Sequence, residues 1–331
     1  MPKDSVAGLL SSPVSLVSSQ GQRHVGSVPT PEMSTGESQP DPKPTFVSTT
    51  TSLTVWGSAP MFFLLTFAVT WSCWIPLITV PIPEHTLTRA VLLFVGIFAP
   101  LLVALSLSAW IEGEPGVRAL LGRMFQWEVG ARWYLFAVGY TLSIKVFVTL
   151  VHRLVTGTWP RFGTVPLYII PFAILISTPV QSGEEVGWRG YALPRMASHL
   201  GLGWASITLG LIWAIWHLPL FFLPGSDTYH QSFIVYTTQV TALSVAMAWL
   251  WEKTGRSLLL TMLMHAAVNN TQGIIPAAVP GGTKTFGFSA SAVSWLAAAM
   301  LWILAAYFLV HMRGNKDDLR LSVVPSELVR K

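Results

Sequence analysis

Five polar residues that can carry out hydrolytic chemistry stand inside long apolar stretches of the chain. They are Glu184, Glu185, His217, His265 and Asn269. A charged side chain near the centre of a bilayer costs about 2.5 to 3.5 kcal/mol on insertion scales, so residues of this kind usually mark functional positions in membrane proteins. We therefore take these five residues as the first candidates for a functional site.

A buried carboxylate beside a histidine can hold and activate a water molecule as a general base. A second histidine and an amide can donate hydrogen bonds to the oxyanion that forms on an attacked carbonyl group. Together these groups suit amide hydrolysis without a covalent enzyme intermediate. Glu184, His217 and His265 are alternatively a possible set of zinc ligands, with a water in the fourth position.

The spacing within the motifs divides the two glutamates. Glu185 and Arg189 are four residues apart with the acid first, which is the favourable order for an ion pair on a helix. Glu184 points about 100° away from Glu185 and can face other helices. His265 and Asn269 are also four residues apart and share a helix face. We therefore expect a structural pair and a separate glutamate that is available for chemistry.

Each motif alone has an ordinary structural interpretation. Adjacent glutamates near an arginine often form a solvated helix end, and a single histidine in an apolar span is often a packing residue. A His–Asn pair can be an interhelical hydrogen-bond site. Lys145 is expected to pair structurally or to extend toward the membrane surface. The functional interpretation depends on all five polar residues occurring in one otherwise apolar chain.

The composition indicates a membrane protein. The chain has 331 residues, of which 52% are hydrophobic and 11% are charged. Soluble domains carry roughly 25% charged residues, so this chain has too little charge to cover a water-exposed surface. The 15 tryptophans are typical of residues at the headgroup layer. The formal charge of +5 is spread over short gaps between apolar runs, so we do not expect nucleic acid as a partner.

The apolar runs predict an all-α, polytopic transmembrane helical bundle of about eight spanning helices, since a spanning helix needs about 17 to 25 apolar residues. The lipid bilayer is then the expected surroundings. The predicted spans are 60–80, 90–111, 133–152, 167–187, 205–223, 232–251, 257–275 and 290–312.

Basic residues are more frequent in the connections on one side of these spans, which by the positive-inside rule is the cytoplasmic side. We expect both termini there, in what the composition suggests is a bacterial cytoplasmic membrane. The connections on that side hold Arg118, Arg123, Arg132, Arg189, Arg195, Lys253 and Arg256, and the others hold Arg89, Arg153, Arg161 and Lys284.

The chain divides by composition into three parts. Residues 1–55 form a polar tail rich in Ser, Thr, Pro and Gly, which predicts a disordered cytoplasmic segment. Residues 56–313 form the transmembrane domain, with the motifs in a core at about 165–275. Residues 314–331 form a basic tail that we also expect in the cytoplasm.

Other classes of membrane enzyme are poorly supported by the sequence. It contains no His-Glu-x-x-His zinc-protease helix, no Gly-x-Ser-Gly segment and no Gly-x-Gly-Asp segment. A P-loop is absent as well. A transporter is a weaker interpretation, because the two halves do not show a matching pair of broken helices.

The three motifs, in this order and each on its own span, resemble those of the CPBP family, the CAAX prenyl protease and bacteriocin-processing proteins also called the Abi family. The motifs are Glu184-Glu185 with Arg189, a histidine four residues after an aromatic residue, and His265 with Asn269. The segment from Leu121 to Tyr134 also looks like that of bacterial members. The resemblance implies an eight-helix intramembrane endopeptidase that opens toward the cytoplasm.

The resemblance also implies the roles of the residues. Glu184 would be the base, His217 would help to position the water, and His265 and Asn269 would stabilise the oxyanion, with Glu185 and Arg189 in support. Trp213 stands where the family commonly has Phe, so an aromatic wall remains but the shape of the pocket can differ.

The resemblance leaves the mechanism and the role open. Members of the family have been described both as metalloproteases and as glutamate proteases, so zinc stays a possible cofactor. The expected partner is a peptide or protein substrate that enters from the membrane or the cytoplasmic side. A non-catalytic membrane scaffold or immunity-type partner of the same family is the alternative function.

Overall fold

The computed structural model describes residues 49–160, 162, 166–272, 285–288 and 290–312, with side chains from residue 58 onward except Gln272. Residues 1–48 of the predicted tail 1–55 and the whole predicted tail 314–331 lie outside these residues, as do the last residues of the predicted span 257–275. Residues 49–55 belong to the first helix, so the prediction of a disordered segment is wrong for them. The described residues form helices and loops only. The predicted all-helical transmembrane bundle is therefore confirmed.

Six helical stretches of the described residues are long and apolar enough to cross a membrane. They correspond to six of the eight predicted spans and begin or end within a few residues of them. The stretches are Ser58–Thr79 in α1 (Thr49–Thr79), α2 (Leu87–Ile111), α4 (Ala131–Thr156), Leu202–Phe222 in α8 (Leu202–Trp216) and η5 (Leu218–Phe222), α9 (Phe233–Lys253) and α11 (Ala292–His311).

The other two predicted spans, which carry two of the three motifs, are helical but short or interrupted. The prediction of one continuous helix over 167–187 is wrong, because Pro179 lacks the N–H that an α-helix needs. That stretch is divided into η2 (Leu167–Ile169), α5 (Ile170–Ser177), η3 (Pro179–Gln181) and α6 (Ser182–Glu185). The third motif lies on α10 (Leu258–Gln272), which has 15 residues.

The chain continues from α6 through a wide π-helical segment, η4 (Val186–Ala192), into α7 (Leu193–Leu200). Such segments inside helices are frequent at functional sites, because the extra residue in the turn changes the direction of the side chains. Between α2 and α4 the chain forms α3 (Gly113–Gly122) and the short turn η1 (Arg123–Phe125).

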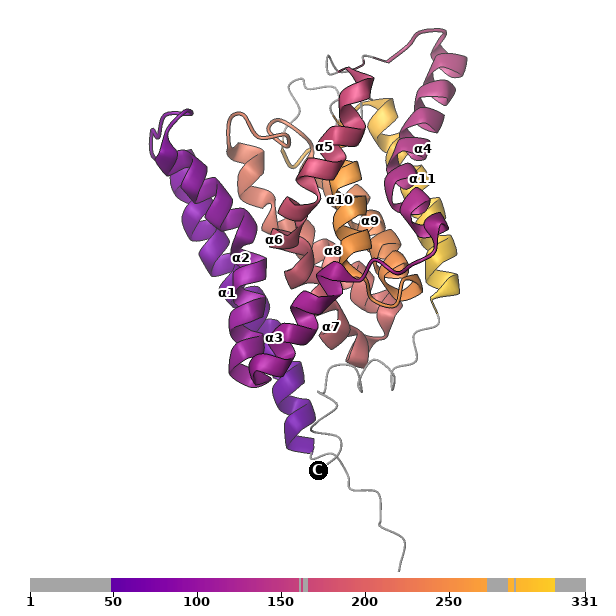
Figure 1. Ribbon diagram of the computed structural model, residues 1–331. Coiled ribbons are helices and arrows are strands. Elements are labelled where there is room, and N and C mark those ends of the chain that lie inside the picture. Colours follow the sequence, from indigo (N-terminus) through magenta and orange to yellow (C-terminus); the bar gives the residue numbers. More distant parts are fainter. Residues whose placement is uncertain (1–48, 161, 163–165, 273–284, 289, 313–331) are drawn as a thin grey trace, which may run out of the picture. The chain divides into compact units, whose positions relative to one another are not determined.

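The helices that carry the motifs are enclosed by other helices. In Figure 1, α6, α8, α9 and α10 lie between the α1–α2 pair and the α4–α11 pair. The closest element pairings agree with this view, since α2 packs on α6 and η4, α8 on α9, and α10 on α4 and α5. The motifs therefore face protein rather than lipid.

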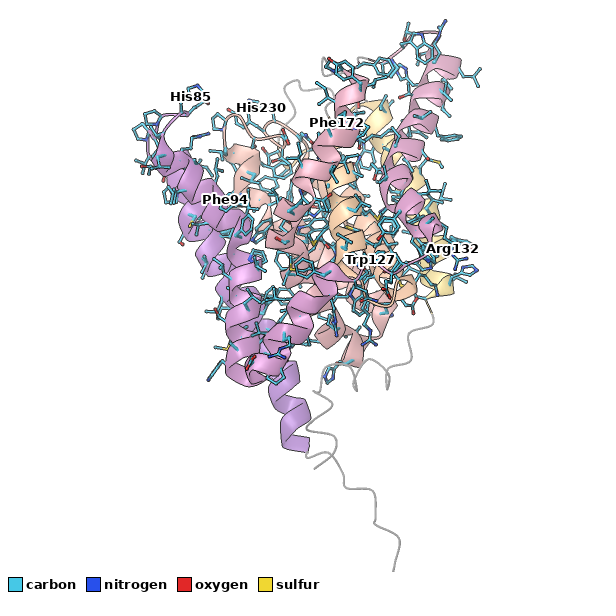
Figure 2. All side chains as sticks on the ribbon, viewed as in Figure 1. His85, Phe94, Trp127, Arg132, Phe172 and His230 are labelled. Atoms are coloured by element: carbon cyan, nitrogen blue, oxygen red, sulfur yellow. The ribbon has the colours of Figure 1, made fainter. Side chains whose placement is uncertain are left out.

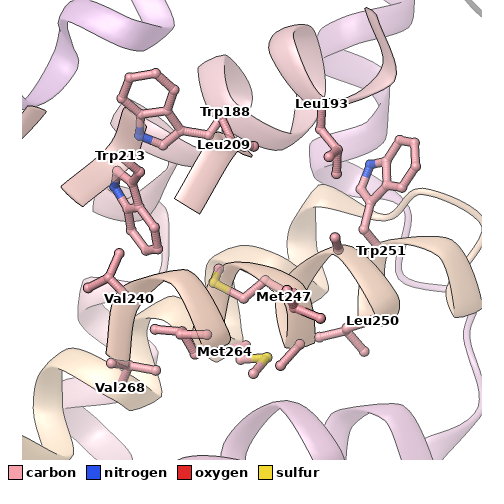
Figure 3. Packing of buried hydrophobic residues seen from close by; sticks show 14 of the residues in the cluster. Trp188, Leu193, Leu209, Trp213, Val240, Met247, Leu250, Trp251, Met264 and Val268 are labelled. Carbon is pink, nitrogen blue, oxygen red and sulfur yellow. The ribbon is translucent and has the colours of Figure 1, made fainter. Parts of the chain in front are cut away.

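Large aromatic side chains fill much of this interior. Trp74, Trp188, Trp216 and Trp251 are fully buried, so these four pack inside the protein. Figure 3 shows Trp188 and Trp213 beside one another above the apolar side chains of α9 and α10. The centroids of the Trp74 and Trp188 rings lie 4.7 and 5.6 Å from that of Trp216.

A glycine lets η4 approach α2 closely beside the first motif. A Cβ atom at Gly187 would lie 2.5 Å from Pro100 Cβ and 2.7 Å from the Pro100 carbonyl oxygen. The backbone of α2 would have to move to admit it. Gly187 thus sets the distance between α2 and the helix that carries the two glutamates.

We expect Gly187→Ala to destabilise the protein by about 1 to 3 kcal/mol, the usual cost of overpacking a close contact. Thermal unfolding in detergent micelles measures the effect. The matched control is Gly139→Ala in α4, where a Cβ meets nothing within 4 Å and the helix gains intrinsic propensity. Equal melting temperatures for the two variants would contradict the packing argument.

Candidate active site

A buried ion network joins the first motif to the third. Arg189 Nη1 donates to Glu185 Oε1 at 2.8 Å, and the same oxygen lies 2.9 Å from His265 Nδ1. Glu185 and Arg189 are fully buried and His265 is 3% exposed. The ion pair expected from the spacing of Glu185 and Arg189 is therefore present, and it also reaches a histidine 80 positions away in the sequence.

The guanidinium of Arg189 is held by an aromatic ring as well as by the carboxylate. Its Cζ atom lies 4.4 Å from the centroid of the Trp213 ring. Arg189 Nε and Nη2 have no hydrogen-bond partner among the described residues, so the face of the indole supplies the remaining electrostatic stabilisation. Trp213, on α8, thus contacts the ion network through the face of its ring.

Trp213 also contacts the other glutamate directly. Its Nε1–H donates to Glu184 Oε2 at 2.7 Å, and Trp188 Nε1–H donates to the same oxygen at 3.4 Å. In Figure 3 the ring nitrogens of the two indoles lie near one another. Both donors act on Oε2, which fixes the carboxylate, and within the described residues no hydrogen bond engages Glu184 Oε1.

His217 lies where α8 ends and the 3-10 turn η5 begins, two residues before Pro219, which cannot continue the α-helix. Its Nδ1 atom is 2.9 Å from the carbonyl oxygen of Trp213. Because a carbonyl oxygen can only accept, Nδ1 carries the proton and Nε2 of the neutral ring is the acceptor.

The two histidines lie on either side of Trp213. The centroid of the Trp213 ring lies 5.8 Å from that of His217 and 5.2 Å from that of His265. Glu184 and His265 are both close enough to act on His217 electrostatically. Residues from α6, α8 and α10 thus converge on one region, and Trp213 is at its centre.

Asn269 stands at the margin of this region. Its side chain is exposed, and Nδ2 lies 3.5 Å from Gln181 Oε1, a long contact. The next residue, Asn270, is held more firmly, with donations to Ser177 Oγ at 2.7 Å and to the Ala266 carbonyl at 2.8 Å. The structure therefore places Asn269 beside the site without fixing its amide.

Three residues near the site were not expected from the sequence. Trp188 donates to Glu184, Gln181 contacts Asn269, and Tyr236 packs on His217. The Tyr236 ring centroid lies 5.6 Å from that of His217. Aromatic residues are common in the apolar spans, so no sequence signal separates Trp188 and Tyr236 from packing residues.

The donor atoms do not form a metal-binding cluster in this conformation. No group of three or more His, Cys, Asp or Glu side chains among the described residues is arranged to hold a metal ion. Glu184 Oε2 accepts from two indoles, and His265 Nδ1 is directed to Glu185. The residues present therefore fit a zinc site poorly in this geometry.

Comparison with known proteins agrees with the fold and the motifs. Residues 164–271 match the family described as type II CAAX prenyl endopeptidase Rce1-like. The chain is also similar to the CAAX prenyl protease 2 of Methanococcus maripaludis, with 22% identity over 228 residues that cover 65% of this chain and 84% of the relative. The segment 164–271 contains all the candidate site residues.

The fold and the comparisons define an integral membrane protein with a polar site enclosed by helices. Residues 164–271, which carry the three motifs, are thus similar to the CAAX/CPBP family of intramembrane proteases, and this similarity supports the resemblance that the motifs indicated.

Removing Arg189 should strongly destabilise the protein, because a buried Glu185 carboxylate would lose its partner. Breaking a buried pair in this way costs about 3 to 5 kcal/mol. We expect Arg189→Met to lower the unfolding free energy in detergent by an amount of this order.

The matched control is Arg118→Met, which removes an arginine from an exposed pair with Glu114 that has the same four-residue spacing. Exposed helix pairs contribute about 0.3 to 0.5 kcal/mol, so this variant should unfold almost as the wild type does. If both variants lost the same stability, Arg189 would not hold a buried network.

Proposed function

We propose that the chain is an intramembrane endopeptidase in which Glu184 activates the water that attacks a peptide bond. The observation that carries the proposal is the convergence of Glu184, His217 and His265 around Trp213, inside the segment that matches the family. The proposed partner is a peptide or protein that reaches the site from the membrane or the cytoplasmic side.

Glu184 and His217 would hold the attacking water between them. Glu184 Oε2 is occupied by indole N–H groups, so Oε1 is the oxygen directed to the water. His217 Nε2 is an acceptor, because Nδ1 donates to the Trp213 carbonyl. In the attack, the water oxygen bonds to the carbonyl carbon and its proton passes to Glu184.

His265 would stabilise the oxyanion formed on the attacked carbonyl. Its Nδ1–H donates to Glu185, so Nε2 becomes a second donor when the ring is protonated. A protonated His265 also balances the buried charges, since Glu184, Glu185 and Arg189 together would otherwise leave one negative charge in excess. Asn269 Nδ2 is the proposed second donor.

The same glutamate would complete the reaction. The proton held by Glu184 passes to the nitrogen of the leaving amine as the carbon–nitrogen bond breaks, which restores the carboxylate. No covalent intermediate with the enzyme forms. Zinc remains a hypothesis for this chain, and a metal analysis of the purified protein tests it directly.

The proposed setting is the bacterial cytoplasmic membrane with both termini in the cytoplasm. The excess of basic residues in one set of connections supports this orientation. The relative from Methanococcus maripaludis carries the name CAAX prenyl protease 2.

We expect Glu184→Gln to lower the cleavage rate of a peptide substrate by at least about 100-fold, the lower range for loss of general-base catalysis. The amide keeps an oxygen that accepts from Trp213 but cannot take the proton of the water. The assay uses purified protein in detergent or vesicles.

Glu114→Gln, at an exposed position on α3, is the control and should keep the wild-type rate. Wild-type turnover in Glu184→Gln would remove the proposed mechanism. An intact cellular phenotype in that variant, with cleavage lost in vitro, would favour the scaffold or immunity-type function instead.

A further inference from the structure

The carbonyl group that precedes His217 loses the partners that a continuous helix would supply. Pro219, three residues after Trp216, has no N–H group to donate. The N–H of Leu220 donates to the His217 carbonyl at 2.9 Å, because the α-helix tightens into the turn η5 there. Trp216 is fully buried, and a buried carbonyl needs a donor. For Trp216 the donor must come from another part of the chain.

An indole of α1 supplies that donor. Trp71 Nε1–H donates to the Trp216 carbonyl oxygen at 3.1 Å, across 145 positions of the sequence. This carbonyl group shares one rigid peptide plane with the backbone nitrogen of His217. The N–H of the same plane donates to the Ala214 carbonyl at 3.2 Å. Trp71 therefore fixes the peptide plane from which the His217 side chain extends.

The neighbouring residue of α1 holds the side chain of Trp216. Trp216 Nε1–H donates to Thr70 Oγ1 at 2.9 Å, and the Thr70 hydroxyl donates to the Gly96 carbonyl of α2 at 3.0 Å. Thr70 is fully buried, as Trp216 is. Two consecutive residues of α1 thus bond to Trp216, one through its backbone and the other through its ring.

The Trp216 ring in turn packs against the His217 ring. The two ring centroids lie 4.6 Å apart at an interplanar angle of 86°. Trp74 of α1 packs on Trp216 as well, with the centroids 4.7 Å apart. The imidazole of His217 therefore stands against an indole that α1 both bonds and covers.

The α1–α2 pair also holds the segment that follows His217. Helix α1 packs on η5, and Arg89 Nη2, at the start of α2, donates to the Pro224 carbonyl at 2.9 Å. Figure 2 shows His85, which lies between α1 and α2, and His230, which follows η5, at the same end of the bundle. The chain before and after His217 is thus bonded to helices that precede the motifs.

We propose that Trp71 is a positioning residue for the cleavage reaction and that Thr70 supports it. This inference rests on the role of His217 in the proposed function. His217 Nε2 accepts from the attacking water only while its ring keeps one orientation, and the bonds from α1 to Trp216 set that orientation from the backbone side. Trp71 acts on the water only through His217.

The segment that matches the family does not include these two residues. It spans 164–271, whereas α1 ends at Thr79. The donor that satisfies the Trp216 carbonyl therefore comes from outside the motif-bearing segment. The orientation of His217 depends on a helix that the motifs do not contain.

The first test is the cleavage kinetics of Trp71→Phe, which keeps an aromatic ring and removes the N–H donor. We expect kcat to fall about 10- to 100-fold with a smaller change in KM, because a catalytic group misplaced by up to about 1 Å loses this much. The assay uses the purified full chain in detergent or vesicles.

Trp302→Phe is the matched control. It removes an indole N–H that donates to the Thr238 carbonyl at 2.9 Å, between α11 and α9. Each variant loses one hydrogen bond of the same kind, so the two should have similar melting temperatures. Only Trp71→Phe should lose kcat.

Thr70 provides a second pair of variants that does not alter Trp71. Thr70→Val removes the hydroxyl at nearly the same volume and leaves Trp216 Nε1–H without its acceptor, so kcat should fall. Thr70→Ser keeps the hydroxyl and should retain most of the wild-type kcat. Equal rates for the two variants would contradict the role of this bond.

The orientation of the His217 ring is also measurable without a substrate, by NMR of the full chain with isotopically labelled histidines. The signals of His217 are assigned from their loss in His217→Gln. We expect the Nδ1–H signal, whose proton is donated to the Trp213 carbonyl, to shift or broaden in Trp71→Phe and to stay unchanged in Trp302→Phe.

These measurements separate the two proposals. If the wild type cleaves no peptide and the His217 signal still changes in Trp71→Phe, the restraint on His217 stands and the proposed function fails. An unchanged His217 signal, a wild-type kcat in Trp71→Phe, or an equal loss of kcat in Trp302→Phe would each overturn the positioning role of Trp71.

Discussion

Carboxylates inside a membrane protein must be compensated by donors that are buried with them, and this requirement organises the structure. Glu185 is compensated by Arg189 and His265, and Glu184 by the indoles of Trp188 and Trp213. Each set includes a group from another helix. Leaving either carboxylate without its donors would cost free energy. The contacts that supply these donors therefore hold α6, η4, α8 and α10 together.

The irregular backbone near the glutamates follows from the same requirement. The stretch that begins at α5 is broken at Pro179 and widens at η4. Irregular backbone at membrane depth is tolerated only where protein covers it, and here α2 and α10 pack against it. Gly187 permits the close approach of α2, so the site and its covering helix depend on one another.

Local spacing in the sequence predicted the parts of the structure that lie on a single helix. The ion pair of Glu185 and Arg189 and six of the spanning helices could be predicted in this way. The contact of His265 with Glu185 and that of Trp213 with Glu184 could not. These join residues 80 and 29 positions apart, and their meeting depends on how three helices pack.

The roles of the aromatic residues could not be predicted from the sequence. Trp213 looked like a wall residue in place of a phenylalanine, yet its ring N–H holds Glu184 and its face covers Arg189. Tryptophan is also used for core packing in this chain, as Trp216 shows. Composition alone does not distinguish these uses, because each depends on the direction of one N–H group.

The most direct test of this account is the cleavage rate of Trp213→Phe, which keeps an aromatic ring but removes the donor to Glu184. We expect kcat to fall about tenfold or more with a smaller change in KM, because a misplaced base loses its orientation toward the water. Trp204→Phe, at an exposed position of α8, should leave both constants unchanged. A wild-type kcat in Trp213→Phe would contradict the claim that this indole orients Glu184.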